Sequence, residues 1–147
     1  MRTLAVCFLL LAACASGKSV ESGAVLDRNT QTEISEVQHV LLGWSSLEAT
    51  YRNMKLPLDP RAQSRTQGDA EKIASQLLAR CTAGEPFEPM MQQYSEDPGS
   101  ASNGMVYTVK PDSRMAQGFV DLALRLKPGE CGIVKTQFGL HVVKRVK

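Results

Sequence analysis

The 147-residue sequence has few groups suited to metal binding and little net charge. It contains only two histidines, His39 and His141, too few for a typical zinc site. The formal net charge is +2, so the chain lacks the strongly basic surface of a nucleic-acid-binding protein. The longest apolar run, from Leu4 to Ala13, has roughly ten residues and is too short to span a bilayer as a helix. We therefore expect no metal ion, no cofactor and no nucleic-acid partner.

The first residues instead resemble a bacterial secretory signal peptide. Arg2 precedes the apolar run and small residues follow it, which is the order found in cleaved export signals. Leu11-Ala12-Ala13-Cys14 resembles the lipobox, in which cleavage before the cysteine is followed by its acylation. The alternative is an ordinary cleavage site in Ala13-Cys14-Ala15, which would release a soluble secreted protein. We favour lipidation of Cys14 because of this cleavage motif. Several acyl chains would then anchor the protein durably.

These features predict how the chain is divided and where it acts. Residues 1–13 are expected to be a lipoprotein signal peptide, residues 14–34 the lipidated cysteine and a flexible linker, and residues 35–147 one domain. The linker prediction follows from the Ser, Gly, Thr and charged residues between positions 15 and 33. The expected location is the bacterial cell envelope, with the protein anchored in a membrane and facing the extracytoplasmic space.

Two cysteines remain after this processing, because Cys7 leaves with the signal and Cys14 is acylated. Cys81 and Cys131 are able to form one disulfide in an oxidising compartment. However, Cys81 falls on the apolar face of a predicted helix. We therefore favour two buried free thiols.

The apolar periodicity predicts an α+β domain. Alternating residues predict a strand over 37–42, and a long exposed loop follows over 43–64. Thr66 and Asp69 form a capping-box pattern before a helix of four turns that ends at Gly84, and Pro86 opens a second, short helix. The remaining elements are a short strand over 106–109, a helix over 115–126 and a hairpin over 133–146. This order favours a small, mostly antiparallel four-stranded sheet surrounded by helices.

Six short motifs within residues 36–146 together resemble the parvulin family of peptidyl-prolyl cis/trans isomerases. Any one of them is weak, but their joint order is specific and agrees with the predicted elements. The motifs are Gln38-His39-Val40-Leu41, Gly84-Glu85-Pro86-Phe87, Tyr94 to Ala101, Met115 to Phe119, Leu126 to Glu130 and Thr136 to Val143. The resemblance implies that the two histidine strands lie side by side at the centre of the sheet.

The same resemblance implies a site without a nucleophile or cofactor. His39, Asp97 and His141 are expected to form one catalytic network. Val106, Met115 and Phe119 are expected to line a proline pocket, with Thr136 and Phe138 at its rim. Taken alone, strand histidines are more often satisfied core residues, and Met115 and Phe119 at helical spacing are ordinary core residues. The resemblance favours the functional interpretation.

The chain departs from the family pattern at two places. Many relatives carry Gly-Gly-Asp-Leu-Gly where this chain has Asn103-Gly104-Met105-Val106-Tyr107, which alters one pocket wall. Relatives that recognise phosphorylated Ser-Pro or Thr-Pro place a basic cluster after the first strand. Here Gly43-Trp44-Ser45 follows, and Arg52, Lys55, Arg61 and Arg65 are spread along the predicted loop. We therefore expect no phosphate specificity.

The resulting hypothesis is a lipid-anchored isomerase that assists the folding of extracytoplasmic, proline-containing polypeptides, either unfolded or newly secreted. The alternative is a non-catalytic peptide-binding chaperone module with the same fold, which the altered pocket wall motivates. A purely structural envelope lipoprotein would leave the histidines, the acid and the pocket unexplained.

Overall fold

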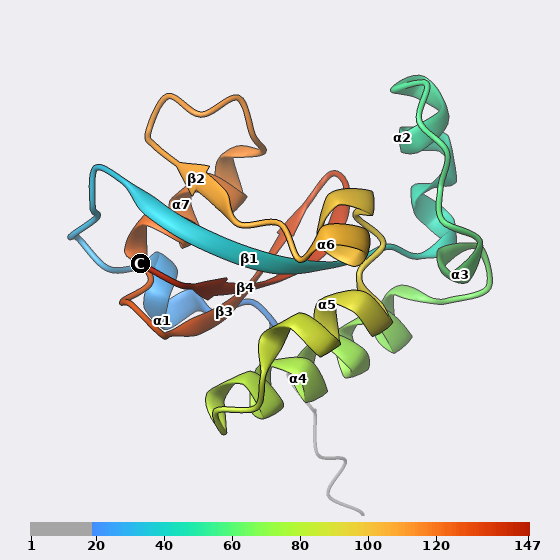
Figure 1. The fold of residues 1–147 in the computed structure, drawn as a ribbon. Helices are drawn as coiled ribbons and strands as arrows, with labels where there is room; N and C mark the ends of the chain where they lie inside the picture. The colour runs from blue at the N-terminus through green and yellow to red at the C-terminus, as the bar shows by residue number, and fades with distance from the viewer. Residues whose placement is uncertain (1–18) are drawn as a thin grey trace, which may run out of the picture.

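A four-stranded antiparallel sheet forms the centre of the computed structural model, which describes residues 19–147 (Figure 1). Its strands are β1 (Ser35–Leu42), β2 (Tyr107–Val109), β3 (Cys131–Thr136) and β4 (Gly139–Arg145), in the order β2-β1-β4-β3. Helices cover both faces, so the predicted α+β class is confirmed. The predicted signal peptide and Cys14 lie outside the described residues. No helix within residues 19–147 is long and apolar enough to cross a membrane.

The two central strands, β1 and β4, have side chains buried on both sides of the sheet. Val40 and Leu42 of β1 belong to one core cluster, whereas Val37 belongs to another. Because successive side chains of a strand point to opposite faces, His39 lies on the same face as Val37. The prediction of a strand buried on both faces is confirmed.

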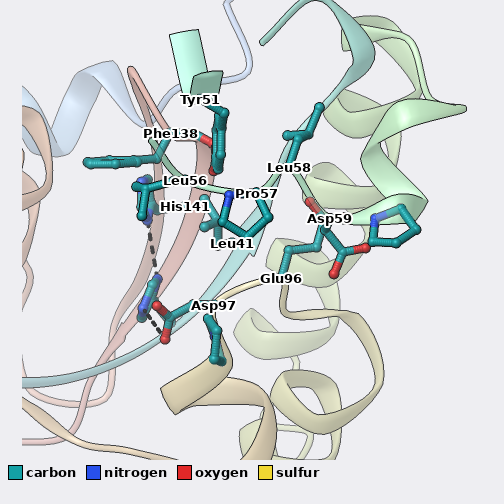
Figure 2. Close-up of a pocket in the computed structure, with 13 residues that line it drawn as sticks. Leu41, Tyr51, Leu56, Pro57, Leu58, Asp59, Glu96, Asp97, Phe138 and His141 are labelled. Carbon is teal, nitrogen blue, oxygen red and sulfur yellow. Dashed lines mark hydrogen bonds and ion pairs between the residues drawn. The ribbon is translucent and has the colours of Figure 1, made fainter. Parts of the chain in front are cut away.

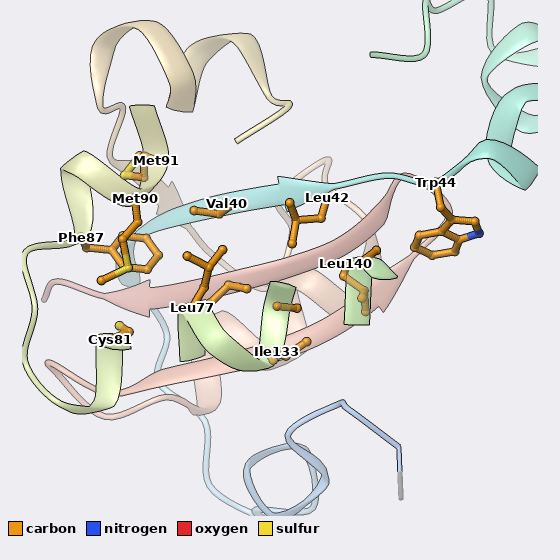
Figure 3. Packing of buried hydrophobic residues seen from close by; sticks show 13 residues of the cluster. Val40, Leu42, Trp44, Leu77, Cys81, Phe87, Met90, Met91, Ile133 and Leu140 are labelled. Atoms are coloured by element: carbon orange, nitrogen blue, oxygen red, sulfur yellow. The ribbon is translucent and has the colours of Figure 1, made fainter. Parts of the chain in front are cut away.

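The first core lies beneath α4 (Gln67–Thr82) and α5 (Phe87–Tyr94) (Figure 3). The predicted capping box begins α4: Thr66 accepts a hydrogen bond from the Asp69 amide, and the Asp69 side chain accepts one from the Thr66 amide. Between the helices Gly84 has a φ of 85°, which favours glycine. Leu77 of α4 and neighbouring apolar side chains of α5 cover β1, β3 and β4.

The second core lies beneath α7 (Gln117–Arg125) and includes α1 (Gly23–Leu26), in the region predicted to be a flexible linker. Val25 is buried in this cluster, and the Ser22 amide donates to the Ile133 carbonyl at 2.8 Å. Arg28 forms a two-pronged ion pair with Glu130. Residues 20–28 therefore pack on the domain, which corrects the linker prediction for that stretch, whereas residues 29–34 are exposed. The linker prediction used the overall composition of residues 15–33, which does not show that single side chains such as Val25 and Arg28 contact the domain.

The segment predicted as a long exposed loop, residues 43–64, is also folded. It contains a 3₁₀ turn, η1 (Ser45–Leu47), and two short helices, α2 (Glu48–Asn53) and α3 (Pro60–Gln63). Tyr51, Leu58 and Ala62 form a small core of their own. The loop prediction is wrong because helices this short show no sustained apolar period. A further short helix, α6 (Pro98–Asn103), precedes β2.

Cys81 and Cys131 form a disulfide, which corrects the prediction of two free thiols. Cys81 lies in the last turn of α4 and Cys131 begins β3, with their Cα atoms 6.3 Å apart. The apolar face of α4 packs directly on β3 in this core, so burial of Cys81 and pairing with Cys131 are compatible.

We expect the Cys131→Ser substitution to lower the unfolding free energy by about 2–4 kcal/mol under oxidising conditions, because the bridge closes a long loop in the unfolded chain. The bridged residues are 50 positions apart. Urea denaturation with and without reductant measures the effect. In reductant the variant and the parent protein should become nearly equal, and an equally large difference there would contradict the assignment.

Candidate functional site

Two buried imidazoles on β1 and β4 form the floor of the site. Leu41 pairs with His141 in the strand register, and His39 pairs with Val143. The histidines are therefore diagonal neighbours on one face, with 3.2 Å between their Nδ1 atoms (Figure 2). The predicted placement of the two histidine strands side by side is confirmed.

Asp97 lies beside this pair, at the N-cap of α6. Its Oδ2 atom accepts hydrogen bonds from the Ser100 amide and from the Tyr107 hydroxyl, each at 2.8 Å. The same oxygen lies 3.6 Å from Nε2 of His39. The structure thus brings His39, Asp97 and His141 together, as the sequence predicts.

When both rings are neutral, the Asp97 carboxylate determines which of their nitrogens carry protons. Nε2 of His39 faces an anion, so that nitrogen carries the proton and Nδ1 is an acceptor. Nδ1 of His141 must then donate to it, which leaves Nε2 of His141 as an acceptor. The Thr136 hydroxyl, 2.8 Å away, donates to that nitrogen and itself accepts from the Phe138 amide. One tautomer of each ring satisfies the whole chain from Thr136 to Asp97.

The surroundings of Asp97 and His141 shift the pKa values of both groups downward. Burial, with a smaller contribution from His39, lowers the pKa of His141 to about 3. The facing imidazole of His39 lowers the pKa of Asp97 well below its usual range, assisted by hydrogen bonds from the Ser100 amide and the Tyr107 hydroxyl. At neutral pH the site therefore holds a carboxylate at one end and a neutral imidazole at the other.

A cavity of about 230 Å³ opens above this floor. Its walls are mostly apolar or aromatic, with Arg114 among the lining residues. Phe119 stands edge-on to both histidine rings, with each pair of centroids 5.2 Å apart. Of the predicted pocket residues, Met115, Phe119 and Phe138 line the cavity.

Two predicted residues lie elsewhere. Val106 is 46% exposed and does not line the cavity, whereas its neighbour Tyr107 does. Adjacent residues in extended chain point to opposite sides, so only one of them can face the site. Thr136 is not at the rim, because it lies behind His141 as a hydrogen-bond partner.

The sequence analysis did not identify Tyr107 as a site residue, although the departure from the family motif over residues 103–107 indicated that this pocket wall is altered. Its ring lies 5.3 Å from that of His39, edge-on, and burial together with Asp97 raises its pKa to about 12. A Cβ atom on Gly99 would lie 2.8 Å from the Tyr107 hydroxyl. Glycine at position 99 therefore leaves the room that the tyrosine needs.

A second cavity, of about 540 Å³, adjoins the first and shares His39, Asp97, Phe138 and His141 with it (Figure 2). Its other walls come from Leu41, from residues 51–60 and from the chain before α6. Tyr51, Leu56 and Leu58 in this wall were also missed, because nothing in their spacing distinguishes them.

The basic residues of segment 43–65 do not form a cluster around either cavity. Arg52 pairs with Glu48, and Arg61 pairs with Asp59. Arg65 pairs with Glu96, whose side chain is almost fully buried. Within residues 19–147 no group of three or more His, Cys, Asp or Glu side chains is placed to hold a metal ion.

Comparison with known proteins identifies a matching domain family and several relatives. The family model described as the PPIC-type PPIase domain matches residues 24–147. A stretch of 75 residues is 40% identical to the foldase protein PrsA of Geobacillus kaustophilus, covering 50% of this chain and 27% of that protein. Another of 82 residues is 33% identical to the chaperone SurA of Chromohalobacter salexigens, covering 55% and 19% respectively. The matched part is thus less than a third of each of these relatives.

Solved structures share the fold. The solution structure of TbPIN1 matches with a TM-score of 0.63 and 28% identity, over 79% of this chain and 99% of that chain. The peptidyl-prolyl isomerase ESS1 of Candida albicans matches with a TM-score of 0.59 and 21% identity, over 78% and 63% respectively. At that identity the second match shows the fold alone.

The low pKa of His141 predicts loss of stability in acid. Between its ordinary value of 6.5 and the folded value of about 3, the unfolded chain binds a proton that the folded chain does not. The free energy of unfolding should therefore fall as the pH decreases from 6.5, by up to about 1.4 kcal/mol per pH unit from this group. Urea denaturation at pH 7 and pH 4.5 tests this, with the His141→Asn variant as comparison. An equal pH dependence in both proteins would contradict the assignment.

Proposed function

Since the chain belongs to the family of PPIC-type peptidyl-prolyl isomerase domains, we propose that it catalyses cis/trans isomerisation of the bond before proline. The observation that carries this proposal is the small cavity with an apolar wall of Met115 and Phe119 above the ordered His39–His141 floor. A proline ring matches such a cavity in size and polarity. The proposed substrates are unfolded polypeptides, newly secreted ones included.

The reaction needs rotation rather than bond cleavage. Amide resonance gives the bond before proline a barrier of about 20 kcal/mol. Twisting the bond breaks this resonance and returns electron density to the prolyl nitrogen. A site that binds the twisted form more tightly than either planar form accelerates rotation in both directions.

In this mechanism the proline ring stays in the cavity while the preceding part of the peptide turns. Met115, Phe119 and Tyr107 hold the ring, and Tyr107 takes the place first assigned to Val106. The anion of Asp97 shapes the electric field at the rotating carbonyl group. His39 and His141 keep the floor in one tautomer, with Thr136 as the outer partner. The low pKa of His141 argues against a role as a proton shuttle at neutral pH.

Activity assays on short Xaa-Pro peptides, by NMR exchange spectroscopy, test the proposal. We expect the described domain to accelerate isomerisation, and Asp97→Ala to lower kcat/KM by about tenfold or more, because the charge at the carbonyl is lost. Met115→Ala should lower kcat/KM by about tenfold through the loss of pocket contacts.

Met105→Ala is the matched control, since Met105 is 41% exposed, Met115 is 36% exposed, and only Met115 lines the cavity. The control should retain the parent activity. Measurable peptide binding without any acceleration by the parent protein would instead favour the chaperone alternative. The similarity to a protein named as a chaperone supports that alternative.

We further propose that the protein acts in the bacterial cell envelope as a lipoprotein. Residues 1–13 would serve as the signal peptide and Cys14 as the acylated residue. Residues 35–147, with the packed residues 20–28, would form the isomerase domain. The proposal is supported by the lipobox-like Leu11-Ala12-Ala13-Cys14. The membrane would then be a partner through the lipid anchor alone.

Cys14→Ser should release the full-length protein from membranes in a fractionation experiment, because the acyl chains supply the anchoring energy. Cys7→Ser is the matched control and should leave the protein in the membrane fraction. Unchanged retention of the Cys14→Ser variant would contradict lipidation.

A further inference from the structure

We propose that Arg114 determines substrate specificity by binding a carboxylate on one of the two residues that follow proline. This rests on the proposed function, because it assumes that proline occupies the cavity of about 230 Å³. Arg114 lies in the loop between β2 and α7 (Figure 1), directly before Met115 of the cavity wall. None of the motifs that indicate the family includes it.

The guanidinium of Arg114 is unused by the fold. It is the one arginine within residues 19–147 whose side chain has no hydrogen-bond or ion-pair partner there. The others form ion pairs with Asp or Glu side chains, except Arg145, which donates to the carbonyls of Leu126 and Lys147. Arg114 is exposed and lines the smaller cavity. Its charge is therefore available to a substrate.

The loop that carries Arg114 is held by its own hydrogen bonds. The Lys110 amide donates to the Ser113 hydroxyl at 2.9 Å, and the Ser113 amide donates to the Lys110 carbonyl at 3.0 Å. The Met115 amide donates to the Ser113 carbonyl at 2.9 Å. These bonds fix the backbone on both sides of Arg114 before a substrate arrives. Binding therefore costs mainly the ordering of one side chain.

The rotation of the substrate indicates which of its residues Arg114 contacts. The peptide before proline turns, and it needs open space beside Asp97, where the two cavities join. Arg114 lies away from this junction, because it lines only the smaller cavity, as do Tyr107, Met115 and Phe119. The residues after proline do not turn and leave the cavity over this wall. A contact to them persists in both isomers.

Charge determines the chemistry of the occupant. The paired N–H donors of a guanidinium match the two oxygens of a carboxylate. Asp97 lines the same cavity, but it accepts hydrogen bonds from the Ser100 amide and the Tyr107 hydroxyl and forms no ion pair with Arg114 within the described structure. It therefore leaves the Arg114 charge without a partner. A lysine after proline would meet like charge, and a neutral residue would gain no ion pair.

Peptides with amidated C-termini and Glu, Gln or Lys at the first or second position after proline test the proposal. Exposed ion pairs are weak, so we expect kcat/KM for the better Glu peptide to exceed that of its Gln counterpart by about threefold to fivefold. The Lys peptide should fall below Gln. The gain should lie in KM with kcat unchanged, because the contact is the same in the planar and twisted forms.

Two controls separate a local contact from a general effect of charge. A peptide with Glu moved several residues further from proline has the same net charge and should show no gain. In about 1 M salt the Debye length is about 3 Å, so the preference for Glu should largely disappear. Dissociation constants from NMR titration keep the series informative without turnover.

Variants of the loop assign the effect to one side chain. Arg114→Gln should remove the preference for Glu over Gln, Arg114→Lys should retain part of it, and Arg114→Glu should reverse it in favour of the Lys peptide. Lys110→Gln is the matched control, because it removes the same charge from an exposed residue of the same loop that does not line the cavity. This control should retain the preference.

The outcomes separate this inference from the proposed function. Turnover with equal kcat/KM for the Glu, Gln and Lys peptides would overturn the role of Arg114 and leave the isomerase proposal intact. Tighter binding of the Glu peptide without turnover would support that role and contradict the isomerase proposal. A preference that survives Arg114→Gln, or that Lys110→Gln also removes, would overturn the assignment. Equal weakening of all peptides by Arg114→Gln would overturn it as well, because Arg114 would then contact the peptide backbone.

Discussion

The hydrogen bonds that attach residues 95–97 to Leu41 of β1 hold the walls of both cavities in place. The buried Ser95 hydroxyl accepts hydrogen bonds from the Leu41 and Asp97 amides, and the Glu96 amide donates to the Leu41 carbonyl. These bonds place Asp97 beside His39 in β1. The Glu96 side chain, turned the other way, binds the Gly43 amide and Arg65 and so holds the start and end of the segment that walls the larger cavity.

The strongest local patterns in the sequence predicted the fold correctly. The capping box and the long apolar stripe of α4 are short-range features that one sequence reveals directly. The alternation in β1 did the same for a central strand. The contact between His39 and His141, about a hundred residues apart, is a tertiary feature that periodicity alone cannot predict. It came from the resemblance to the family, which carries the strand order with it.

The errors share a physical cause, since each concerns a contact between distant segments. Val25 and Arg28 find partners on α7 and near β3, but the segment around them is mostly polar and charged, with a short apolar stretch over 24–26. Tyr51 and Leu58 lie in a segment without periodicity, and their burial depends on Phe138 and Ala62. Cys81 and Cys131 each fit a buried thiol until α4 is placed on β3. Tyr107, rather than the predicted Val106, faces the site. Adjacent residues of an extended chain point to opposite sides, and the sequence does not show at which residue the three-residue strand β2 begins.

The buried chain from Thr136 to Asp97 makes the two histidines interdependent. Replacing one ring with an apolar side chain would leave Nδ1 of the other without its partner, which costs more than the loss of one ordinary hydrogen bond. The energetic effects of changing His39 and His141 should therefore be non-additive. The Asp97 carboxylate at the end of this chain favours a proton on Nε2 of His39 and so sets the order of donors and acceptors between the two neutral rings. Burial of His141, which makes acid destabilising, also keeps that ring neutral beneath the smaller cavity.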